Sequence, residues 1–234
     1  MASVRTVLAA GAVVAAGCLV AAAVLLGGDA GSGSGSGGSG DGSGAGGRLP
    51  GQGLPSRLAP ERPPVYTVWA GPGCRTETTY REEGRFENGD AAWFTVPSGG
   101  FRGGGCDGRF TALPMSGSPD RDGTGAVTWS WPIGPGYTRC ALAVYVPEGR
   151  RDIDVAGDPT VFRVLADPDD PGSAYAVFGV LQKIHRGSLV QVGSYDVRSP
   201  DFTVRLTDRG RDWGARPLTG AHHAAAQLRL TCRE

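Results

Sequence analysis

The sequence carries no excess of either charge, because its 23 lysine and arginine residues are matched by 23 aspartate and glutamate residues. Proteins that bind nucleic acids neutralise phosphates with a positive surface, so their sequences are usually basic. A neutral chain gives such a role no support, and we expect no nucleic-acid partner.

The motifs of common enzyme chemistry are also missing. The sequence has no G-x-S-x-G nucleophile motif, no H-E-x-x-H metal motif and no C-x-x-C pair. Its glycine-rich stretch stands in no strand-to-helix context that would cradle a phosphate. We therefore expect no catalytic residues, no metal and no cofactor. Carboxylates that only the fold brings together would escape this argument, so an extracellular hydrolase remains the weaker alternative.

Charge is absent from one long segment near the N-terminus. Val7–Leu26 is a run of twenty uncharged, mostly apolar residues, which is long enough to cross a bilayer as a helix. Arg5 favours a cytoplasmic N-terminus with the rest of the chain outside. Three alternatives stay open for residues 1–28: a retained signal-anchor, a signal peptide cleaved near Gly28-Asp29-Ala30, or a lipoprotein acylated at Cys18. All three export the remaining chain.

Residues 29–64 have little that could fill a core. The first part is nearly all glycine and serine up to Gly47, and Arg48–Pro64 is rich in proline. Chains of this composition stay flexible or extended, so we expect a disordered linker. Apolar content becomes normal only from Val65, and the remaining length of about 170 residues suits one domain with a core. The predicted domain covers residues 65–234.

The predicted domain has many short strands. The clearest is Tyr137–Pro147, where Leu142 and Val144 lie on one apolar face and Ala143 and Tyr145 lie on the other. The other expected strands are Val65–Trp69, Thr78–Phe86, Ala91–Val96, Arg109–Met115, Ala126–Ile133, Thr160–Leu165, Ala174–Gln182, Ser188–Val197, Phe202–Thr207 and a last strand that ends at Arg233. Turn residues interrupt the chain every few positions, which is typical of an antiparallel β-sandwich.

Two local features add to this pattern. Glu87-Asn88-Gly89-Asp90 contains an Asn-Gly turn signal, which predicts a hairpin between the strands on either side of it. The alanine-rich stretch His222–Gln227 is the one place where a short helix is conceivable.

The predicted domain contains four cysteines once Cys18 is set aside, and an even number in an exported domain indicates two disulfides. Three pairings are open in principle. Cys74 and Cys106 follow glycine-rich turns and lie in loops, whereas Cys140 and Cys232 share the parity of apolar strand faces. Joining loop with loop and strand with strand is the simplest solution, so we expect Cys74–Cys106 and Cys140–Cys232.

Short motifs recur in a fixed order along the C-terminal half. They are a Val-Tyr-Val-Pro strand ending at Pro147, Asp158-Pro159 at the next strand, Gln182, Arg186-Gly187, Val192-Gly193, and a final strand with Ala225 and Arg229. In this order they resemble the golvesin C-terminal-like domain, a carbohydrate-binding-like family of secreted bacterial proteins, over about Thr124–Cys232. Leu189 and Ala226 depart from the pattern, which has a tryptophan and an aspartate there. The resemblance implies a jelly-roll-like β-sandwich with an accessory role and no catalytic residues.

The tryptophans separate into two groups. Trp69, Trp129 and Trp131 lie in predicted strands, where large aromatic side chains usually build the core. Trp213 follows Asp212 in a polar loop, where two alternatives stay open. The ring either stacks on a sugar at the surface or folds over the core as a lid.

The neighbours of Trp213 are chemically suited to a carbohydrate. Arg211 and Asp212 supply a hydrogen-bond donor and an acceptor beside the ring. His222 and His223 point to opposite faces of a strand, so one of them can add a polar edge, although a structural role for both is the competing interpretation. We expect the loop and the two histidines to meet at one end of the sandwich, where such folds carry recognition.

Two aspartate-rich stretches, Asp120–Gly123 and Asp167–Asp170, contain part of a calcium-loop pattern but lack the remaining ligands. Taken with the features above, the sequence predicts a non-catalytic, adhesin-like binding module. Its expected partners are cell-envelope or extracellular polysaccharide and, through residues 1–28, the membrane. A structural or protein-interaction ectodomain is the alternative.

Overall fold

A computed structural model describes residues 65–89, 91–214 and 216–233. The predictions of an N-terminal helix and of a linker, which concern residues 1–64, fall outside the described residues. Within these three ranges, no helix has the length and apolar character needed to span a membrane.

The described residues form strands joined by loops and by short 3₁₀ helices, which confirms the all-β class. The strands are β1 (Val65–Ala70), β2 (Thr79–Glu83), β3 (Phe94–Val96), β4 (Arg102–Gly103), β5 (Cys106–Asp107), β6 (Phe110–Pro114), β7 (Ala126–Pro132), β8 (Arg139–Val146), β9 (Thr160–Leu165), β10 (Ala174–Val180), β11 (Ser188–Asp196), β12 (Asp201–Thr207), β13 (His222–Ala225) and β14 (Leu228–Arg233). The 3₁₀ helices are η1 (Asp152–Val155), η2 (Pro171–Ser173) and η3 (Arg216–Leu218).

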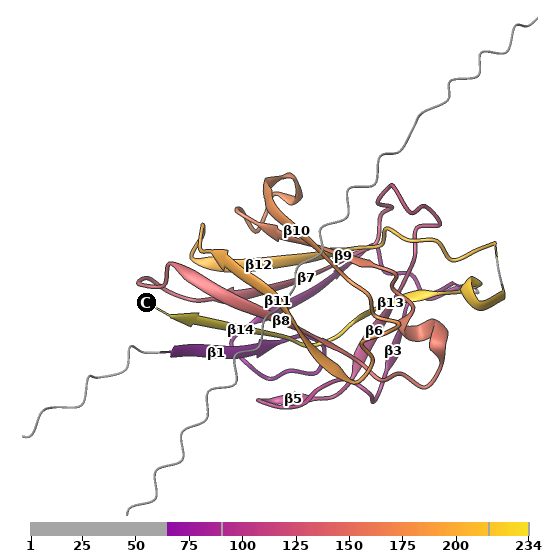
Figure 1. Cartoon of the computed structure of the whole chain (residues 1–234), viewed down its shortest axis with the longest axis horizontal. Coiled ribbons are helices and arrows are strands. Elements are labelled where there is room, and N and C mark those ends of the chain that lie inside the picture. Colours follow the sequence, from indigo (N-terminus) through magenta and orange to yellow (C-terminus); the bar gives the residue numbers. More distant parts are fainter. Residues whose placement is uncertain (1–64, 90, 215, 234) are drawn as a thin grey trace, which may run out of the picture. The chain divides into compact units, whose positions relative to one another are not determined.

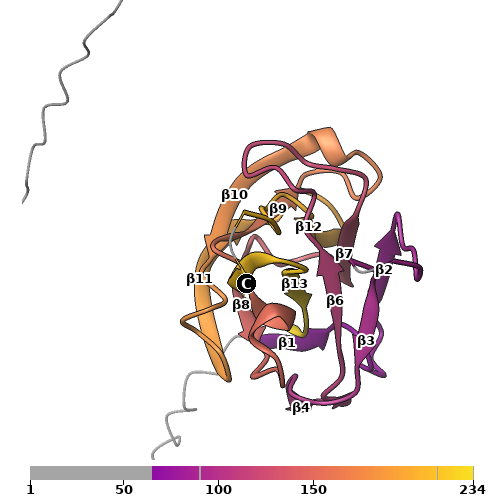
Figure 2. The same ribbon diagram turned by 90° about the vertical axis from the view of Figure 1, so that its right-hand side faces the viewer.

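Two larger antiparallel sheets build the body of the domain (Figure 1). One has the strand order β1-β14-β8-β11, and the other has the order β10-β9-β12-β7-β2. A third sheet, β13-β6-β3, lies at the end of the molecule that is on the right in Figure 1 and faces the viewer in Figure 2. A two-stranded ribbon pairs β4 with β5.

The core lies between the two larger sheets. Trp129 and Trp131 of β7 are fully buried, as predicted from their strand position. Their indole N–H groups donate to the carbonyl oxygens of Ala226 at 3.0 Å and of Val68 at 3.3 Å. These bonds satisfy the polar edge of each ring inside the core, and they join β7 to β1 and to the segment between β13 and β14.

Strand β8 is central, with β14 on one side and β11 on the other. Leu142, Val144 and Val146 point into the core and are fully buried. The opposite face is covered at one end by Phe101, whose ring lies 5.7 Å from that of Tyr145. The second face is therefore partly covered, with Ala143 buried and Ala141 and Tyr145 half-buried, which agrees with the apolar residues that the sequence has on both faces.

Trp69 is buried, as expected, but on the outer face of its sheet. Its neighbour Val68 is in register with Leu230 and therefore faces the core, so Trp69 points away from it. The indole ring stacks on Phe101 with 3.7 Å between centroids. The glycine-rich loop that carries Phe101 thus covers an aromatic residue that would otherwise be exposed.

His222–Gln227 forms no helix, which corrects one sequence prediction. Its first four residues form β13, which pairs with β6 in the register Ala224↔Ala112. All four residues of β13 are buried. Alanine favours helices in isolation, but tertiary packing overrides so weak a preference.

The predicted hairpin between β2 and β3 is also wrong. Beyond one hydrogen bond from the Trp93 N–H to the Phe86 carbonyl (2.9 Å), the two strands separate into different sheets. β2 pairs with β7, and β3 pairs with β6. Gly89 adopts the positive φ of +100° that a turn requires, so the sequence located the turn but not the strand partners.

Both predicted disulfides are present. The loop disulfide joins Cys74 to Cys106, and the strand disulfide joins Cys140 of β8 to Cys232 of β14. Cys140 and Cys232 are directly opposite in the antiparallel register and are buried. Disulfides persist in oxidising compartments, so these cross-links are consistent with a location outside the cytoplasm.

A buried glutamine completes the pairing of β13. Gln182 is fully buried, and its side-chain amide hydrogen-bonds with both backbone groups of Ala224. Its Nε2–H donates to the Ala224 carbonyl at 2.8 Å, and its Oε1 accepts the Ala224 N–H at 2.9 Å. A single side chain therefore does what a neighbouring strand would do for this residue.

Replacing Gln182 by leucine should destabilise the domain by about 2 kcal/mol, because two buried backbone groups lose their partners while the volume of the side chain is nearly retained. Urea unfolding measures the change. The matched control is Gln191→Leu at an exposed position of β11, where we expect a change within about 0.5 kcal/mol. Equal effects of the two substitutions would contradict a structural role for the Gln182 amide.

Candidate functional site

Trp213 lies at the surface, in the segment that connects β12 to η3. Its side chain is 58% exposed. The indole Nε1–H donates a hydrogen bond to the carbonyl oxygen of Gly117 at 2.7 Å. This bond fixes one edge of the ring and leaves ring surface open to solvent. Trp213 is therefore not a lid over the core.

A groove of about 610 Å³ lies beside Trp213, and we call it the aromatic groove. The residues that line it are Gly89, Ala91, Ala92, Phe94, Arg151, Ile153, Asp212, Trp213, Thr219, Gly220 and His222. They come from four separate stretches of the chain that meet at the end of the domain formed by β3 and β13 (Figure 2). The groove thus unites Trp213 with His222, as the sequence predicts for this end of the sandwich.

The aromatic groove combines ring surfaces with a fixed positive charge. Phe94 and His222 meet edge to face with 5.0 Å between ring centroids. The Arg151 guanidinium lies 5.2 Å from the Phe94 centroid and forms an ion pair of 2.6 Å with the buried carboxylate of Asp154. The hydrogen bond with Asp154 raises the pKa of Arg151 and holds this cation in place.

His222 contributes a neutral ring to this groove. Burial lowers the pKa of His222 below its ordinary value, so the ring is uncharged at neutral pH. Its Nε2–H donates to the carbonyl oxygen of Ala92 at 3.0 Å. The side chain is only 2% exposed. It therefore forms part of the groove wall and supports Phe94.

A second hollow of about 490 Å³ is lined by other residues of the same segment, and we call it the basic hollow. It is lined by Met115, Pro119, Ala156, Asp158, Pro159, Val161, Lys183, Arg209, Gly210, Arg211, Leu218 and His223. Three of its side chains are cationic and one is anionic. The segment from Arg209 to Trp213 therefore lines the basic hollow with its first three residues and the aromatic groove with its last two.

His223 lies opposite to His222, as expected for neighbours on a strand. It is fully buried, with Nδ1 2.9 Å from the Thr160 hydroxyl and Nε2 2.9 Å from the carbonyl oxygen of Arg209. Burial lowers the pKa of His223 to about 4, so the ring is neutral and its Nε2–H donates to that carbonyl. With both nitrogens engaged, His223 positions Arg209 and presents no free polar edge to a ligand.

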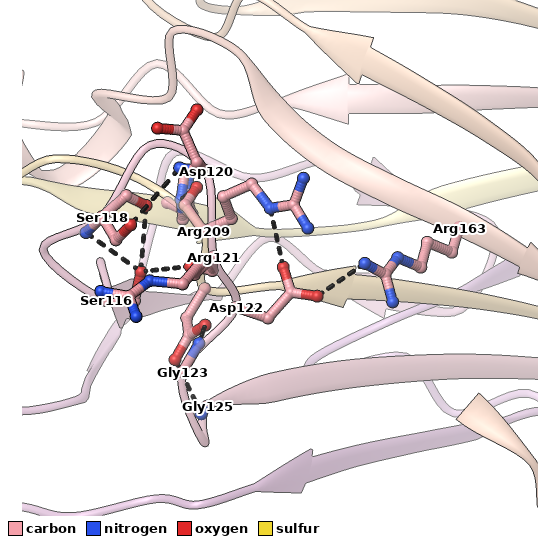
Figure 3. Close-up of polar contacts among 11 residues, drawn as sticks. Ser116, Ser118, Asp120, Arg121, Asp122, Gly123, Gly125, Arg163 and Arg209 are labelled. Atoms are coloured by element: carbon pink, nitrogen blue, oxygen red, sulfur yellow. Dashed lines mark hydrogen bonds and ion pairs between the residues drawn. The ribbon is translucent and has the colours of Figure 1, made fainter. Parts of the chain in front are cut away.

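A neighbouring loop, residues 116–125, contacts Arg209 at the start of the segment that carries Trp213 (Figure 3). Asp122 bridges two arginines: its Oδ2 lies 2.6 Å from Arg163, and its Oδ1 lies 3.0 Å from Arg209. Burial of the Asp122 carboxyl raises its pKa, but the hydrogen bond from Arg209 and the charge of Arg163 outweigh burial and lower the pKa overall. Asp122 is thus an ion-pair partner in this structure.

Asp208 anchors the same loop from the end of β12. Its buried carboxylate accepts the backbone N–H of Gly123 at 2.6 Å and of Gly125 at 2.8 Å. The Asp208 carbonyl oxygen accepts the Ser116 N–H at 2.7 Å. These bonds, with the bond from Trp213 to Gly117, hold the indole on a rigid support. Asp208 has no motif around it, so sequence reasoning missed it.

The second aspartate-rich stretch, Asp167–Asp170, forms turns in this structure. Asp167 accepts the N–H of Asp169 at 3.0 Å, and Asp170 accepts the N–H of Gly172 at 2.7 Å. Among the residues that the structure describes, no group of three or more His, Cys, Asp or Glu side chains is placed to hold a metal ion.

The sequence indicated part of this site. Trp213, Asp212 and His222 line the aromatic groove, whereas Arg211 and His223 line the basic hollow. Phe94 and Arg151 were not predicted, because they reach the groove from distant segments. Trp93 and Phe94 are neighbours in the expected strand Ala91–Val96, so their side chains lie on opposite faces and one of them points outward. The structure buries Trp93 to 2% and leaves Phe94 partly exposed.

Protein-family models, curated proteins and solved structures were compared with this chain, and none matches it. The function must therefore be argued from the geometry of the site. The arrangement offers stacking surfaces, hydrogen-bonding groups and fixed charges on rigid supports, which suits the recognition of a polar ligand with apolar faces.

Proposed function

We propose that this protein is a non-catalytic, exported binding module for cell-envelope or extracellular polysaccharide. The observation that carries the proposal is the exposed ring of Trp213, fixed at its edge by Gly117 and set above an aromatic groove. Sugars combine apolar C–H faces with many hydroxyl groups, so they stack on an aromatic ring and hydrogen-bond at its rim. Asp212 and Arg211 flank the ring and supply such groups.

We also propose that the domain belongs to the golvesin C-terminal-like family and has its jelly-roll-like topology. We further propose that Val7–Leu26 tethers the protein to the membrane. Recovery of the intact N-terminal peptide from the membrane fraction by peptide mapping tests this tethering. A single shallow stacking site binds weakly, and many modules on one surface would give useful retention through multivalency.

Replacing Trp213 by alanine should lower the affinity for cell-wall or exopolysaccharide preparations about tenfold, because the loss of one aromatic stacking contact costs on the order of 1.4 kcal/mol. Pull-down of the full-length protein with each preparation measures the loss. The free energy of unfolding should fall by only about 1 kcal/mol, the contribution of the single hydrogen bond to Gly117.

Two further variants sharpen this test. Trp213→Phe retains a stacking face and should keep most of the binding. Val177→Ala removes a side chain that is 63% exposed on β10, and it should leave binding unchanged. Unaltered binding by a folded Trp213→Ala variant would mean that the ring is no platform.

A protein-interaction ectodomain is the second candidate, and the observation that favours it is the exposure of apolar side chains that line neither the aromatic groove nor the basic hollow. Val177 is 63% exposed and Ile184 is 70% exposed. If Val177→Ala abolishes capture of a protein while glycan binding is absent from the parent, this second function replaces the first.

A further inference from the structure

Arg211 lines the basic hollow and lies next to Trp213, which lines the aromatic groove. Its guanidinium carbon lies 5.7 Å from the centroid of the Trp213 ring, and its side chain lines the basic hollow. Arg211 itself is exposed. Within residues 65–89, 91–214 and 216–233, no salt bridge engages it. An arginine without an anionic partner, held beside an exposed tryptophan, is available to a ligand.

The other cations of the basic hollow are only partly compensated. Lys183 forms an ion pair of 3.0 Å with Asp158 at the rim. Arg209 donates its Nε–H to Asp122, which it shares with Arg163. Positive charge therefore remains in the hollow, and Arg211 contributes most of this excess because the other two cations have carboxylate neighbours.

A carboxylate is an anion that suits this arrangement. The planar guanidinium of Arg211 can bind both oxygens of a carboxylate in parallel hydrogen bonds. Pro159, Val161 and Leu218 give the hollow apolar wall surface that can contact the C–H groups of a sugar ring. The 5.7 Å between the Arg211 guanidinium and the Trp213 ring is short enough for neighbouring residues of one polysaccharide chain to reach both.

We propose that this site selects acidic polysaccharide, with Trp213 stacking on a sugar ring and Arg211 binding the carboxylate of a sugar acid. Lys183 and Arg209 add to the positive field that attracts such a polymer. This inference rests on the proposed function and specifies the substrate class of the same site. Neutral polysaccharides fill the stacking position but leave the Arg211 charge without a partner.

The test compares two acidic polymers with their own esters. Full-length protein is titrated with polygalacturonate and with alginate, and then with methyl-esterified polygalacturonate and propylene glycol alginate. Each ester retains the sugar backbone and removes the charge of the carboxyl group. We expect at least one acidic polymer to bind about tenfold more tightly than its ester, as a charge-assisted hydrogen-bonded pair would provide. The preference should shrink as salt is added.

Variants assign the preference to its residues. Arg211→Gln should bring the affinities for acid and ester together, whereas Trp213→Ala should weaken both. The matched control is Arg198→Gln. Arg198 also lies over an aromatic ring, with its guanidinium carbon 4.1 Å from the centroid of Tyr175. It precedes β12, whereas Arg211 follows that strand. The control should leave the preference intact.

Each result separates the two proposals. Equal affinity for acid and ester, with binding that depends on Trp213, overturns the selection of acidic polymers and leaves the polysaccharide-binding function in place. An acid preference that survives Arg211→Gln overturns the assignment of Arg211. Absence of binding to all four polymers and to cell-envelope preparations overturns the inference and the proposed function together.

Discussion

Removal of the strand disulfide, by changing both of its cysteines to alanine, is expected to lower the free energy of unfolding by about 4–5 kcal/mol. The bond Cys140–Cys232 closes a loop with a sequence separation of 92 residues, and it restricts the unfolded chain accordingly. The loop disulfide Cys74–Cys106 spans only 32 residues, and the same chain-entropy relation gives about 3–4 kcal/mol for its removal.

Urea unfolding of the two double variants measures the difference between the bonds. The strand disulfide joins neighbouring strands inside the core, so its loss also removes buried sulfur from close packing. This loss of packing adds to the entropic effect and increases the difference in unfolding free energy between the two double variants. A loop-disulfide variant that is less stable than the strand-disulfide variant would contradict the ranking.

Acidification from pH 7 to pH 4 is expected to cost the domain about 3 kcal/mol through His223 alone. The pKa of this residue is about 4 in the folded protein and 6.5 in the unfolded chain. Between these values the unfolded state binds a proton that the folded state does not, so stability is complete above about pH 6.5 and falls steadily until pH 4. A difference of 2.5 pKa units corresponds to roughly 3 kcal/mol.

His222 contributes in the same direction, because burial lowers its pKa as well. Carboxylates such as Glu83, whose pKa the hydrogen bond from Arg205 lowers below 4.5, begin to lose their stabilising contribution as the pH falls through about 4.5. Unfolding free energies measured at several pH values between pH 7 and about pH 5 therefore report mainly on the two histidines.

The variant His223→Gln provides the control for acid sensitivity. Glutamine can still bond with Thr160 and with the Arg209 carbonyl, but it cannot take up a proton. The variant should lose much of the pH dependence between pH 7 and pH 4, whatever its absolute stability. If the unfolding free energy of the variant changes with pH as steeply as that of the parent, His223 does not govern the acid sensitivity.

The candidate site was only partly predictable, and particular residues show why. Trp213 stands out in the sequence as a tryptophan in a polar loop, but its exposure depends on a hydrogen bond to Gly117, almost a hundred positions earlier. Asp208 bonds to Gly125 across a separation of 83 residues. No local pattern marks such partners, so the support of the indole could be found only in three dimensions.

Alternation of apolar residues determined the all-β class, most strand positions and the parity that paired Cys140 with Cys232, since a strand places successive side chains on opposite faces. Tertiary structure alone decided that β2 and β3 separate into different sheets, that His222–Ala225 pairs with β6, and that one segment lines both an aromatic groove and a basic hollow. Alternation acts within a few residues, whereas strand partners and exposure depend on contacts between segments far apart in the chain, where burial outweighs local preference.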